Sequence, residues 1–317
     1  MDAAIGIDWG TSNLRATLFD AYGGIRDERN CPWGILQLPE GGFERALADV
    51  CHGWPNAPIV TSGMVGSRHG WREAAYVDVP ADLAALVHHV TTVNTSGGHA
   101  LSIVPGVRDT NLPDVMRGEE TEIMGALVLR PDLAANVQIV LPGTHSKWVD
   151  IRESKIVGFR TMMTGELYSL LITHSILGAT IPAGAQPATD WPAFDAGVRT
   201  ACAAGNAGAL SRIFSARPLV LESRLAPDAV PSYISGLLIG DEWRAMSASG
   251  WLQPGTSPLL VGDAVHCVLY QRAATAFDIP PPQSLNGAAA RGLWQIHAAL
   301  LEHVAGIAPC GHKDMSE

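Results

Sequence analysis

Apolar and polar positions form three short runs at the start of the chain. The run AIGI is apolar throughout, as in a buried strand, whereas LRATLFD alternates apolar and polar side chains, as in a strand with one buried face. The tripeptide YGG supplies a turn before the third run, IRDERN. These runs predict a three-stranded meander over residues 3–31.

Strand and helix patterns then alternate along the rest of the chain. The segments NVQIVLPG, THSKWVDI and KIVGFR repeat the strand–turn–strand arrangement of the N-terminus, so we predict two lobes, residues 1–134 and 135–317. The other predicted strands are APIVTSG, HALSIVPG and PLLVG. The predicted helices are FERALADVCHGW, ADLAALVHHV, EETEIMGALVLR, GELYSLLITHSILG, DAGVRTACAAG, SYISGLLIGDEWRAMSA, GDAVHCVLYQRAATAF and SLNGAAARGLWQIHAALLEHV.

Composition narrows the class of protein. Of the 317 residues 47% are hydrophobic and 16% are charged, so the chain can bury a large core and is long enough for two domains. The formal net charge is −10 and lysine and arginine do not cluster, which argues against general nucleic-acid or anionic-membrane binding. Five scattered cysteines without a CxxC pair are typical of thiols in a reducing compartment. With no signal-peptide pattern and no apolar membrane span, we expect a soluble cytoplasmic protein.

The turn after the first strand carries residues suited to a nucleoside triphosphate. Asp8 lies near the end of the strand, and the turn consists of Gly10, Thr11, Ser12 and Asn13. Glycine lets the backbone approach phosphate oxygens closely, and turn N–H groups and hydroxyls can donate to those oxygens. A carboxylate would repel phosphate directly, so we expect Asp8 to hold Mg²⁺ through water. The alternative is an ordinary hairpin whose polar residues satisfy one another.

The stretch IGIDWGTSNLRATLFDAYGGI resembles the first phosphate motif of the sugar kinase, Hsp70 and actin superfamily. The resemblance includes the arginine after the turn and an Asp-x-x-Gly at the second corner. It implies an α/β, two-lobed actin-like ATPase fold of the ribonuclease H-like type, with a nucleotide cleft between the lobes. The chain contains neither a P-loop nor a G-x-G-x-x-G motif, which disfavours the other common nucleotide folds.

The same resemblance implies a second phosphate loop at the start of the second lobe. The segment VLPGTHSKWVDI has the required form, and we expect Gly143 and Thr144 to contact phosphate. Val140 and Leu141 occupy the region where an acidic residue commonly leads this loop in sugar kinases, so we expect no contribution to metal binding here. Lys147 either adds positive charge at the phosphate or is a solvated strand residue.

The resemblance also implies a glycine-containing turn that binds adenosine, after a strand late in the chain. The segment PLLVGDAVHCVLYQRA fits this description, since Gly262 ends a strand and Asp263 stands where the N-cap of the next helix belongs. A capped helix without any nucleotide contact is the simpler interpretation of the same residues.

Further segments point to a narrower family. TSGMVGSRHGWREAAY, DVMRGEETEIMGAL, LPGTHSKWV, MTGELYSLL and SYISGLLIGDE together resemble the 2-dehydro-3-deoxygalactonokinase family, in that family's order. The resemblance implies that the γ-phosphate of ATP, bound with Mg²⁺, is transferred to the terminal hydroxyl of a 2-keto-3-deoxy sugar acid. The implied product is 2-dehydro-3-deoxy-6-phosphogalactonate, formed in galactonate breakdown.

A carboxylate at a helix start is the expected base for the sugar hydroxyl. Glu119 and Glu120 follow a glycine in the first turn of a predicted helix, which resembles the helix start that supplies the catalytic acid in many sugar kinases. Such a group can accept the alcohol proton during in-line attack. The helix dipole alone also favours acidic residues at this position. We favour Glu119, with Asp109 and Asp114 as alternatives.

Arginine is the expected ligand of the sugar carboxylate, because its planar guanidinium binds two oxygens at once. Arg68 in GMVGSRHGW is the first candidate, followed by Arg108 and Arg117, and we expect at least one of them to form a surface or structural ion pair. Glu166 either reads sugar hydroxyls or caps its helix. His174, alone on an apolar helix, is interpreted as a core residue.

Two other functions fit the same residues. One is a kinase of the same superfamily with another acceptor, such as 2-keto-3-deoxygluconate or a neutral sugar. The other is a nucleotide-driven switch or filament protein, against which the short chain and the glycine-rich segment SGMVGSRHG argue. The expected partners are ATP and a small sugar acid, without nucleic acid or membrane. The sequence leaves the oligomeric state open, a homo-oligomer included.

Overall fold

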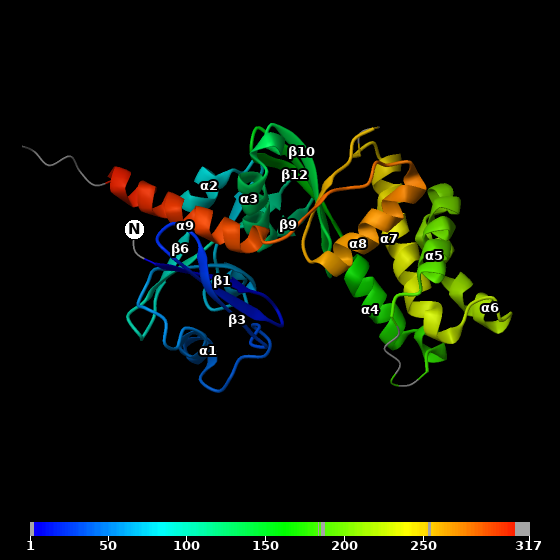
Figure 1. Ribbon diagram of the computed structural model, residues 1–317, viewed down its shortest axis with the longest axis horizontal. Helices are drawn as coiled ribbons and strands as arrows, with labels where there is room; N and C mark the ends of the chain where they lie inside the picture. The colour runs from blue at the N-terminus through cyan, green and yellow to red at the C-terminus, as the bar shows by residue number, and fades with distance from the viewer. Residues whose placement is uncertain (1–2, 183, 185–187, 253–254, 308–317) are drawn as a thin grey trace, which may run out of the picture. The chain divides into compact units, whose positions relative to one another are not determined.

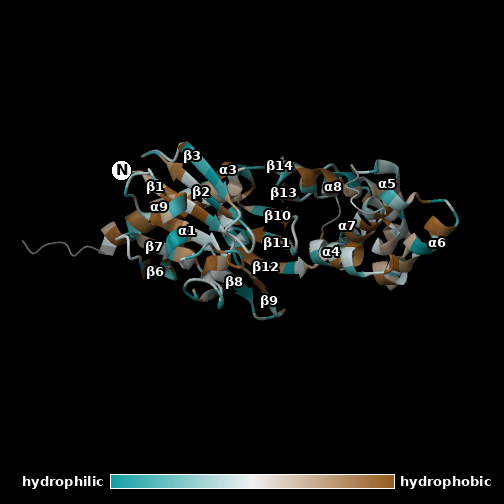
Figure 2. Ribbon diagram, turned by 90° about the horizontal axis from the view of Figure 1, so that it is seen from below, coloured by the Kyte–Doolittle hydropathy of each residue, from teal (hydrophilic) through white to brown (hydrophobic). Residues whose placement is uncertain are grey.

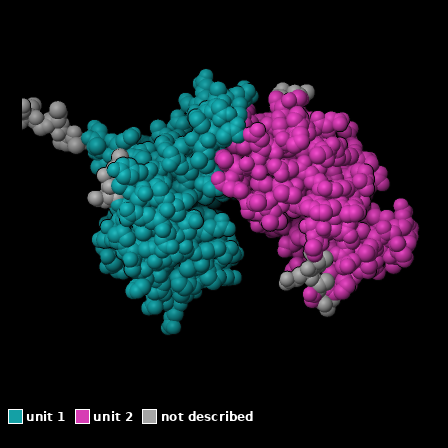
Figure 3. Space-filling view, viewed as in Figure 1, with its two compact units in different colours: residues 1–136, 151–158, 287–317 teal, residues 137–150, 159–286 magenta. Residues whose placement is uncertain are grey.

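The computed structural model of the chain divides into two compact units (Figure 1 and Figure 3). The residues that the structure describes are 3–182, 184, 188–252 and 255–307. Unit 1 comprises Met1–Asn136, Ile151–Gly158 and Gly287–Glu317, and unit 2 comprises Val137–Asp150 and Phe159–Asn286.

The strands of unit 1 form a six-stranded sheet in the order β3-β2-β1-β4-β7-β6 and a small sheet in the order β5-β8-β9. The predicted meander is the first half of the large sheet: β1 and β2 pair antiparallel, as do β2 and β3, whereas β4 runs parallel to β1. The strands are β1 (Ala4–Trp9), β2 (Leu14–Phe19), β3 (Ile25–Cys31), β4 (Ile59–Gly63), β5 (Tyr76–Asp78), β6 (Thr91–Asn94), β7 (Ala100–Ile103), β8 (Gly106–Asp109) and β9 (Asp114–Met116).

Helices cover both faces of the large sheet. Ile7 and Leu14 belong to the buried cluster that also contains Leu47 of α1. On the other face Val60 of β4 packs with Leu293 of α9. Burial of these side chains provides the main stabilisation of the unit. The helices of unit 1 are α1 (Gly42–Val50), α2 (Leu83–His88), α3 (Glu119–Leu129) and α9 (Ala288–Ile307).

The C-terminal helix α9 belongs to unit 1, and Figure 1 shows it (red) beside α3. The two helices cross closely at glycines, since a Cβ atom on Gly125 would overlap the carbonyl group of Ala288, and one on Gly292 that of Thr121. The division therefore differs from the predicted lobes 1–134 and 135–317. Order along the chain did not reveal this crossing because it joins residues more than 160 positions apart.

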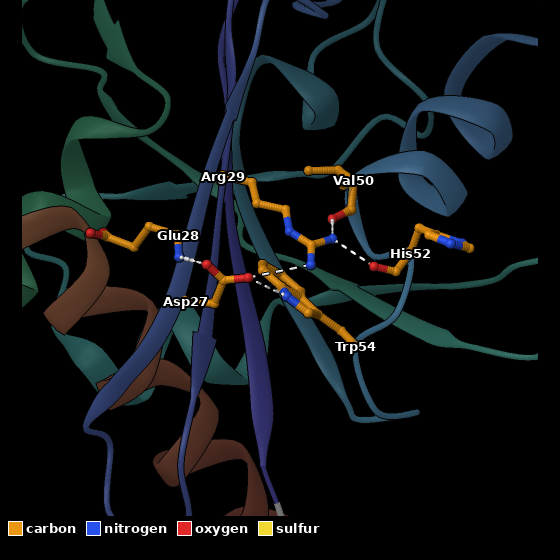
Figure 4. Close-up of polar contacts among 6 residues, drawn as sticks. All are labelled: Asp27, Glu28, Arg29, Val50, His52 and Trp54. Atoms are coloured by element: carbon orange, nitrogen blue, oxygen red, sulfur yellow. Dashed lines mark hydrogen bonds and ion pairs between the residues drawn. The ribbon is translucent and has the colours of Figure 1, made fainter.

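The edge strand β3 is hydrophilic (Figure 2), and its side chains fasten it to the end of α1 (Figure 4). Arg29 Nη1 donates to the carbonyl oxygens of Val50 at 2.6 Å and His52 at 2.8 Å, and its guanidinium lies 4.3 Å from the ring centroid of Trp54. Asp27 Oδ2 accepts from Trp54 Nε1 at 2.8 Å and from Arg29 Nη2 at 3.3 Å. Carbonyl groups at a helix C-terminus lack hydrogen-bond donors within the helix, and here Arg29 is the donor.

We expect Arg29→Ala to lower the free energy of unfolding by roughly 1–3 kcal/mol, because two carbonyl groups lose a charged donor. Urea denaturation of the two proteins measures the difference. Arg29→Lys keeps the charge but loses the planar fork, so it should show an intermediate loss. Equal midpoints for Arg29→Ala and the unaltered protein would contradict this role.

Unit 2 contains most of a five-stranded sheet in the order β12-β11-β10-β13-β14, of which residues 151–158, at the turn between β11 and β12, are assigned to unit 1. Its core surrounds Trp148 and Trp243, whose rings meet edge to face with centroids 4.9 Å apart. The strands are β10 (Asn136–Leu141), β11 (Ser146–Arg152), β12 (Lys155–Met162), β13 (Leu259–Val261) and β14 (Ser284–Leu285). The helices are α4 (Thr164–His174), α5 (Trp191–Ala203), α6 (Ala216–Leu221), α7 (Val230–Ala248) and α8 (Ala264–Ala274).

Three expectations from the sequence can be compared with these units. His174 is exposed at the end of α4, so its interpretation as a core residue was wrong: α4 contains no fully buried residue that would enclose it. Within the described ranges no helix has the length and apolarity needed to cross a membrane. Cys31, Cys51, Cys202 and Cys267 are free thiols, and Cys310 lies outside the described residues.

Candidate active site

The first phosphate motif forms the predicted turn between β1 and β2. The Gly10 N–H donates to the Asn13 carbonyl oxygen at 2.9 Å, and Thr11, Ser12 and Asn13 are exposed. Among the described residues no hydrogen bond engages the side chains of these three, so the polar residues do not satisfy one another as in an ordinary hairpin. The turn therefore has its hydroxyls and its amide available for a ligand.

Residues 34–36, which follow the meander, contact the backbone of this turn. The Ile35 N–H donates to the Gly10 carbonyl oxygen at 3.1 Å, and the Leu36 N–H donates to that of Thr11 at 3.3 Å. A Cβ atom on Gly34 would overlap the backbone of Thr11, so only glycine permits this approach. The backbone of the turn is thus held in place while its side chains stay exposed.

Asp8 lies half-buried near the end of β1, opposite Arg15 on β2 and Ser62 on β4. Burial raises the pKa of Asp8, the positive charge of Arg15 opposes this shift, and the negative charge of Glu119 adds to it. The electrostatic contact with Glu119 means that the helix start of α3 approaches the strand end. Unit 1 therefore brings together the metal candidate and one of the base candidates.

The two glutamates at the start of α3 differ in accessibility. Glu120 is fully buried, with Oε2 accepting from the Gly118 N–H at 2.7 Å and Oε1 from Thr121 Oγ1 at 3.1 Å. Burial, followed by the charge of Glu119, raises the pKa of Glu120 to about 7. Glu119 is only half-buried, with Oε2 accepting from the Arg117 N–H at 2.9 Å. Of this pair, only Glu119 has surface that a substrate could reach.

Glu122 is a third glutamate near Asp8, and it was not among the residues predicted from the sequence. Burial raises its pKa to about 8, with further contributions from the charges of Asp8, Glu119 and Glu120. Its position three residues after Glu119 places both side chains on one side of the helix, a spacing that could have identified it. We refer to Asp8, Glu119, Glu120 and Glu122 as the acidic cluster.

The raised pKa of Glu122 predicts a pH-dependent cost to stability. Below the pKa of about 4.5 that Glu122 has in the unfolded chain, its carboxyl group is protonated in both the folded and the unfolded protein. Between about pH 4.5 and pH 8 the folded protein binds more protons than the unfolded chain, so the free energy of unfolding falls as the pH rises. We therefore expect Glu122→Gln to match the unaltered protein near pH 4.5 and to be more stable at pH 9. Thermal unfolding at both pH values measures this, and an equal difference at both would contradict the electrostatic cause.

The three candidate arginines have different surroundings. Arg68 is exposed and pairs with no other residue in the described ranges. Arg108 Nε donates to Asp78 Oδ1 at 2.7 Å in an exposed ion pair, which raises the pKa of Arg108. Arg117 Nη2 donates to the Ala74 carbonyl oxygen at 2.8 Å, its guanidinium lies 4.3 Å from the ring centroid of Tyr76, and its Nε and Nη1 are buried without a hydrogen-bond partner among the described residues. Arg68 is therefore the arginine that is free to bind a carboxylate.

The alternative bases Asp109 and Asp114 both accept hydrogen bonds from backbone. Asp109 is buried and its Oδ1 accepts from the N–H groups of Asn111 at 2.9 Å and Leu112 at 3.3 Å. Asp114 Oδ1 accepts from the Val115 N–H at 2.8 Å. The bonds of Asp109 order the turn between β8 and β9, and the bond of Asp114 lies at the start of β9, so both carboxylates have a role in the local fold.

The second phosphate loop connects β10 to β11 in unit 2. A Cβ atom on Gly143 would meet no atom of the described residues within 4 Å, so no contact among them requires a glycine there. Thr144 is exposed, and its carbonyl oxygen accepts from the Glu166 N–H at 3.0 Å. Gly165 at the start of α4 packs directly on the backbone of the loop. The start of α4 therefore fixes the backbone of the loop, while Thr144 stays exposed.

Two basic residues lie at the end of this loop, His145 within it and Lys147 at the start of β11. Lys147 is only 3% exposed, and its Nζ donates to the His145 carbonyl oxygen at 3.0 Å, so its interpretation as a solvated strand residue was wrong. His145 is exposed, and its Nε2 lies 2.5 Å from Glu166 Oε2. Glu166, which was expected to read sugar hydroxyls or cap its helix, is thus a partner of the phosphate loop.

The turn expected to bind adenosine follows β13. Gly262 has a φ of 149°, a conformation that other residues rarely adopt. Asp263 is the N-cap of α8, as predicted, with Oδ1 accepting from the His266 N–H at 3.0 Å. Both residues have roles in the local fold, and the role in adenosine binding stays a prediction.

Comparison with known proteins identifies the family. The family model described as 2-keto-3-deoxy-galactonokinase matches residues 8–296. The chain belongs to this family of carbohydrate kinases. It is 37% identical over 247 residues to the 2-dehydro-3-deoxygalactonokinase of Escherichia coli (strain K12), a match that covers 76% of this chain and 80% of that protein.

Solved structures bear on the fold. A putative 2-dehydro-3-deoxygalactonokinase from Sinorhizobium meliloti matches with a TM-score of 0.82 and 32% identity over 95% of this chain and 99% of that one. An activator of 2-hydroxyisocaproyl-CoA dehydratase from Clostridium difficile matches with a TM-score of 0.50 and 10% identity over 98% and 100%, a likeness of fold alone. The predicted actin-like ATPase class of the kinase is confirmed.

A buried carboxylate joins the start of β11, directly after the second phosphate loop, to helices α7 and α8 of unit 2. Glu242 on α7 accepts from Ser146 Oγ at 2.6 Å, Trp148 Nε1 at 2.8 Å and the Tyr270 hydroxyl at 2.8 Å. Burial raises the pKa of Glu242, and hydrogen bonds from Ser146, Thr164, Trp148 and Tyr270 lower it. Glu242 ends the segment SYISGLLIGDE, which was quoted for its resemblance to the family, but no role was predicted for it from the sequence.

We expect Glu242→Ala to lower the free energy of unfolding by at least about 3 kcal/mol, because several buried donors lose their acceptor at once. Thermal or urea denaturation of the kinase measures this loss. Glu222→Ala, at an exposed glutamate, serves as the control and should change stability by no more than about 0.5 kcal/mol. Similar losses in the two variants would contradict the role of the network.

Proposed function

We propose that the kinase transfers the γ-phosphate of ATP to the terminal hydroxyl of 2-dehydro-3-deoxy-D-galactonate. The product is the 6-phosphate, a step in galactonate breakdown. The proposal is supported by the family match over residues 8–296 and by the name of the E. coli relative. The structural observation that carries it is the open turn of Thr11, Ser12 and Asn13 beside the acidic cluster. The free thiols and the use of ATP favour a cytoplasmic location.

The phosphates of ATP are assigned to the two loops. In unit 1 the N–H groups of the first turn and the hydroxyls of Thr11 and Ser12 donate to phosphate oxygens. In unit 2 the Gly143 N–H and the Thr144 hydroxyl do the same, and Gly262 and Asp263 contact adenosine. Because such donors are fixed before the reaction, they stabilise the charge of the transferring group without reorganisation.

Mg²⁺ is part of this proposal, and the acidic cluster suits it. In the described residues no three or more His, Cys, Asp or Glu side chains are placed so that they alone could hold a metal ion. Mg²⁺ in kinases is bound by one or two carboxylates together with substrate phosphates and water, so a complete protein cage is not needed. Asp8 and Glu122 are carboxylates whose raised pKa values reflect burial near like charge, which a bound cation would relieve. When bound, the ion offsets the negative charge of the phosphates.

The acceptor groups are assigned to unit 1. Glu119 accepts the proton of the sugar hydroxyl while that oxygen forms a bond to the γ-phosphorus and the bond to ADP breaks. Arg68 binds the carboxylate of the sugar acid, since its guanidinium is exposed and unpaired among the described residues. Glu120, buried and bonded to the Gly118 N–H, positions the helix start.

ADP release with ATP, Mg²⁺ and a panel of acceptors tests the proposal. The panel contains 2-dehydro-3-deoxygalactonate, 2-dehydro-3-deoxygluconate, galactonate, glucose, glycerol and no acceptor. We expect strong stimulation by the first compound and weak stimulation by the others. Stronger stimulation by the gluconate-derived compound would assign the kinase to another acid. An ADP release rate that no acceptor changes would favour a nucleotide-switch protein of the same fold.

A further inference from the structure

The second phosphate loop has two basic side chains, of which only one is accessible. Lys147 is 3% exposed and its Nζ is bonded to the His145 carbonyl oxygen, so it cannot reach a bound phosphate without leaving that contact. The His145 side chain is 47% exposed and directly follows Thr144. Of these two basic side chains, the imidazole is therefore the one that is accessible to a phosphate bound by Gly143 and Thr144.

The imidazole is held in a defined orientation. Its Nε2 lies 2.5 Å from Glu166 Oε2, and the Glu166 N–H is bonded to the Thr144 carbonyl oxygen at 3.0 Å. Glu166 is thus fixed to the loop both through its backbone and through its side chain. A carboxylate can only accept, so Nε2 carries a hydrogen and Nδ1 is left without a partner among the described residues. A proton on Nδ1 makes the ring a cation that is paired with Glu166 and able to donate outward.

We propose, on the basis of the proposed function, that His145 is the cationic contact of the second phosphate loop. Its Nδ1–H donates to an oxygen of the phosphoryl group during transfer, and Glu166 is the positioning residue that holds the ring. In this step the P–O bond to ADP breaks, the bond to the sugar oxygen forms, and the hydroxyl proton goes to the general base. His145 keeps its own proton throughout. This assignment gives His145 the charge that the sequence suggested for Lys147.

Two replacements of His145 separate its two nitrogens. The side-chain amide of asparagine can place a donor near Nδ1, whereas that of glutamine places one near Nε2. We expect His145→Gln to lower kcat by about 10²–10³-fold with little change in KM for the sugar acid, as for the loss of one transition-state donor. His145→Asn should keep roughly tenfold more activity than His145→Gln. His174→Gln, at an exposed histidine of α4, is the matched control and should retain normal kcat.

Glu166→Gln tests the positioning role. We expect it to lower kcat less than His145→Gln does, and the double variant to be no slower than His145→Gln alone. Additive losses in the double variant would show that Glu166 acts independently and would overturn its role. An increase in KM for the sugar acid without loss of kcat in either single variant would assign the pair to the acceptor and overturn the proposal.

Calorimetric titration with ATP and with ADP tests the contact without any acceptor. If His145 touches the γ-phosphate, the preference of the protein for ATP over ADP should fall by about tenfold in His145→Gln. An unchanged preference would overturn the proposal. If no acceptor is phosphorylated by the unaltered kinase, the proposed function fails, whereas the titration still decides whether His145 binds the terminal phosphate.

Discussion

Asp8→Asn should lower kcat for ATP-dependent phosphorylation by at least about 10²-fold, since a metal-binding carboxylate contributes several kcal/mol to phosphoryl transfer. Asp8 lies near the end of β1, and the exposed phosphate turn begins two residues later. The replacement keeps the size of the side chain and removes its charge. Steady-state ADP release with saturating sugar acid measures the loss.

The same variant should be as stable as the unaltered kinase or more stable. Burial and Glu119 both raise the pKa of Asp8, so its charge is unfavourable in the folded protein without a ligand. Asp20→Asn is a matched control in the next turn of the meander, where Oδ1 of Asp20 accepts from the N–H groups of Tyr22 and Gly24 at 2.8 Å. Asparagine retains an oxygen for these bonds, so normal kcat is expected. Normal kcat in Asp8→Asn would remove Asp8 from the reaction.

Glu119→Gln should lower kcat by about 10²–10⁴-fold, the contribution typical of a general base, with little change in KM for the sugar acid. Glutamine preserves an oxygen that can accept from the Arg117 N–H, so the helix start should stay intact. Rates measured over a range of sugar-acid concentrations separate kcat from KM.

Glu120→Gln is the matched comparison, because the two glutamates are neighbours with opposite accessibility. Glu120 is fully buried, with both carboxylate oxygens bonded within the first turn, so its replacement should alter stability more than kcat. A larger loss of kcat in Glu120→Gln than in Glu119→Gln would reverse the assignment of the base.

Local patterns predicted the elements of the fold that depend on nearby residues. The meander at residues 3–31, the N-cap at Asp263 and the helix beginning at Glu119 all follow from neighbouring side chains and turns. The return of α9 to unit 1 depends on a crossing at Gly125 and Gly292, which the order of elements cannot reveal. The sheet β5-β8-β9 was also missed, because strands of three or four residues are too short to show a period.

The candidate site was predicted in part for the same reason. Asp8 and the exposed turn are contiguous in sequence, so their motif is visible, and Glu122 could have been recognised from its helical spacing to Glu119. The burial of Lys147 and the hydrogen-bond partners of Glu242 could not be predicted, since both depend on distant segments. Pairing of His145 with Glu166 likewise needs the start of α4 to pack on the loop.

Analysis of the reaction product by phosphorus–proton correlation NMR tests the assigned reaction most directly. The kinase is incubated with ATP, Mg²⁺ and 2-dehydro-3-deoxygalactonate, and the sugar product is examined without further treatment. We expect one phosphate monoester coupled to the protons of the terminal carbon, formed in equal amount with ADP. Release of inorganic phosphate with an unmodified sugar, or a phosphate on another carbon, would contradict the assigned reaction.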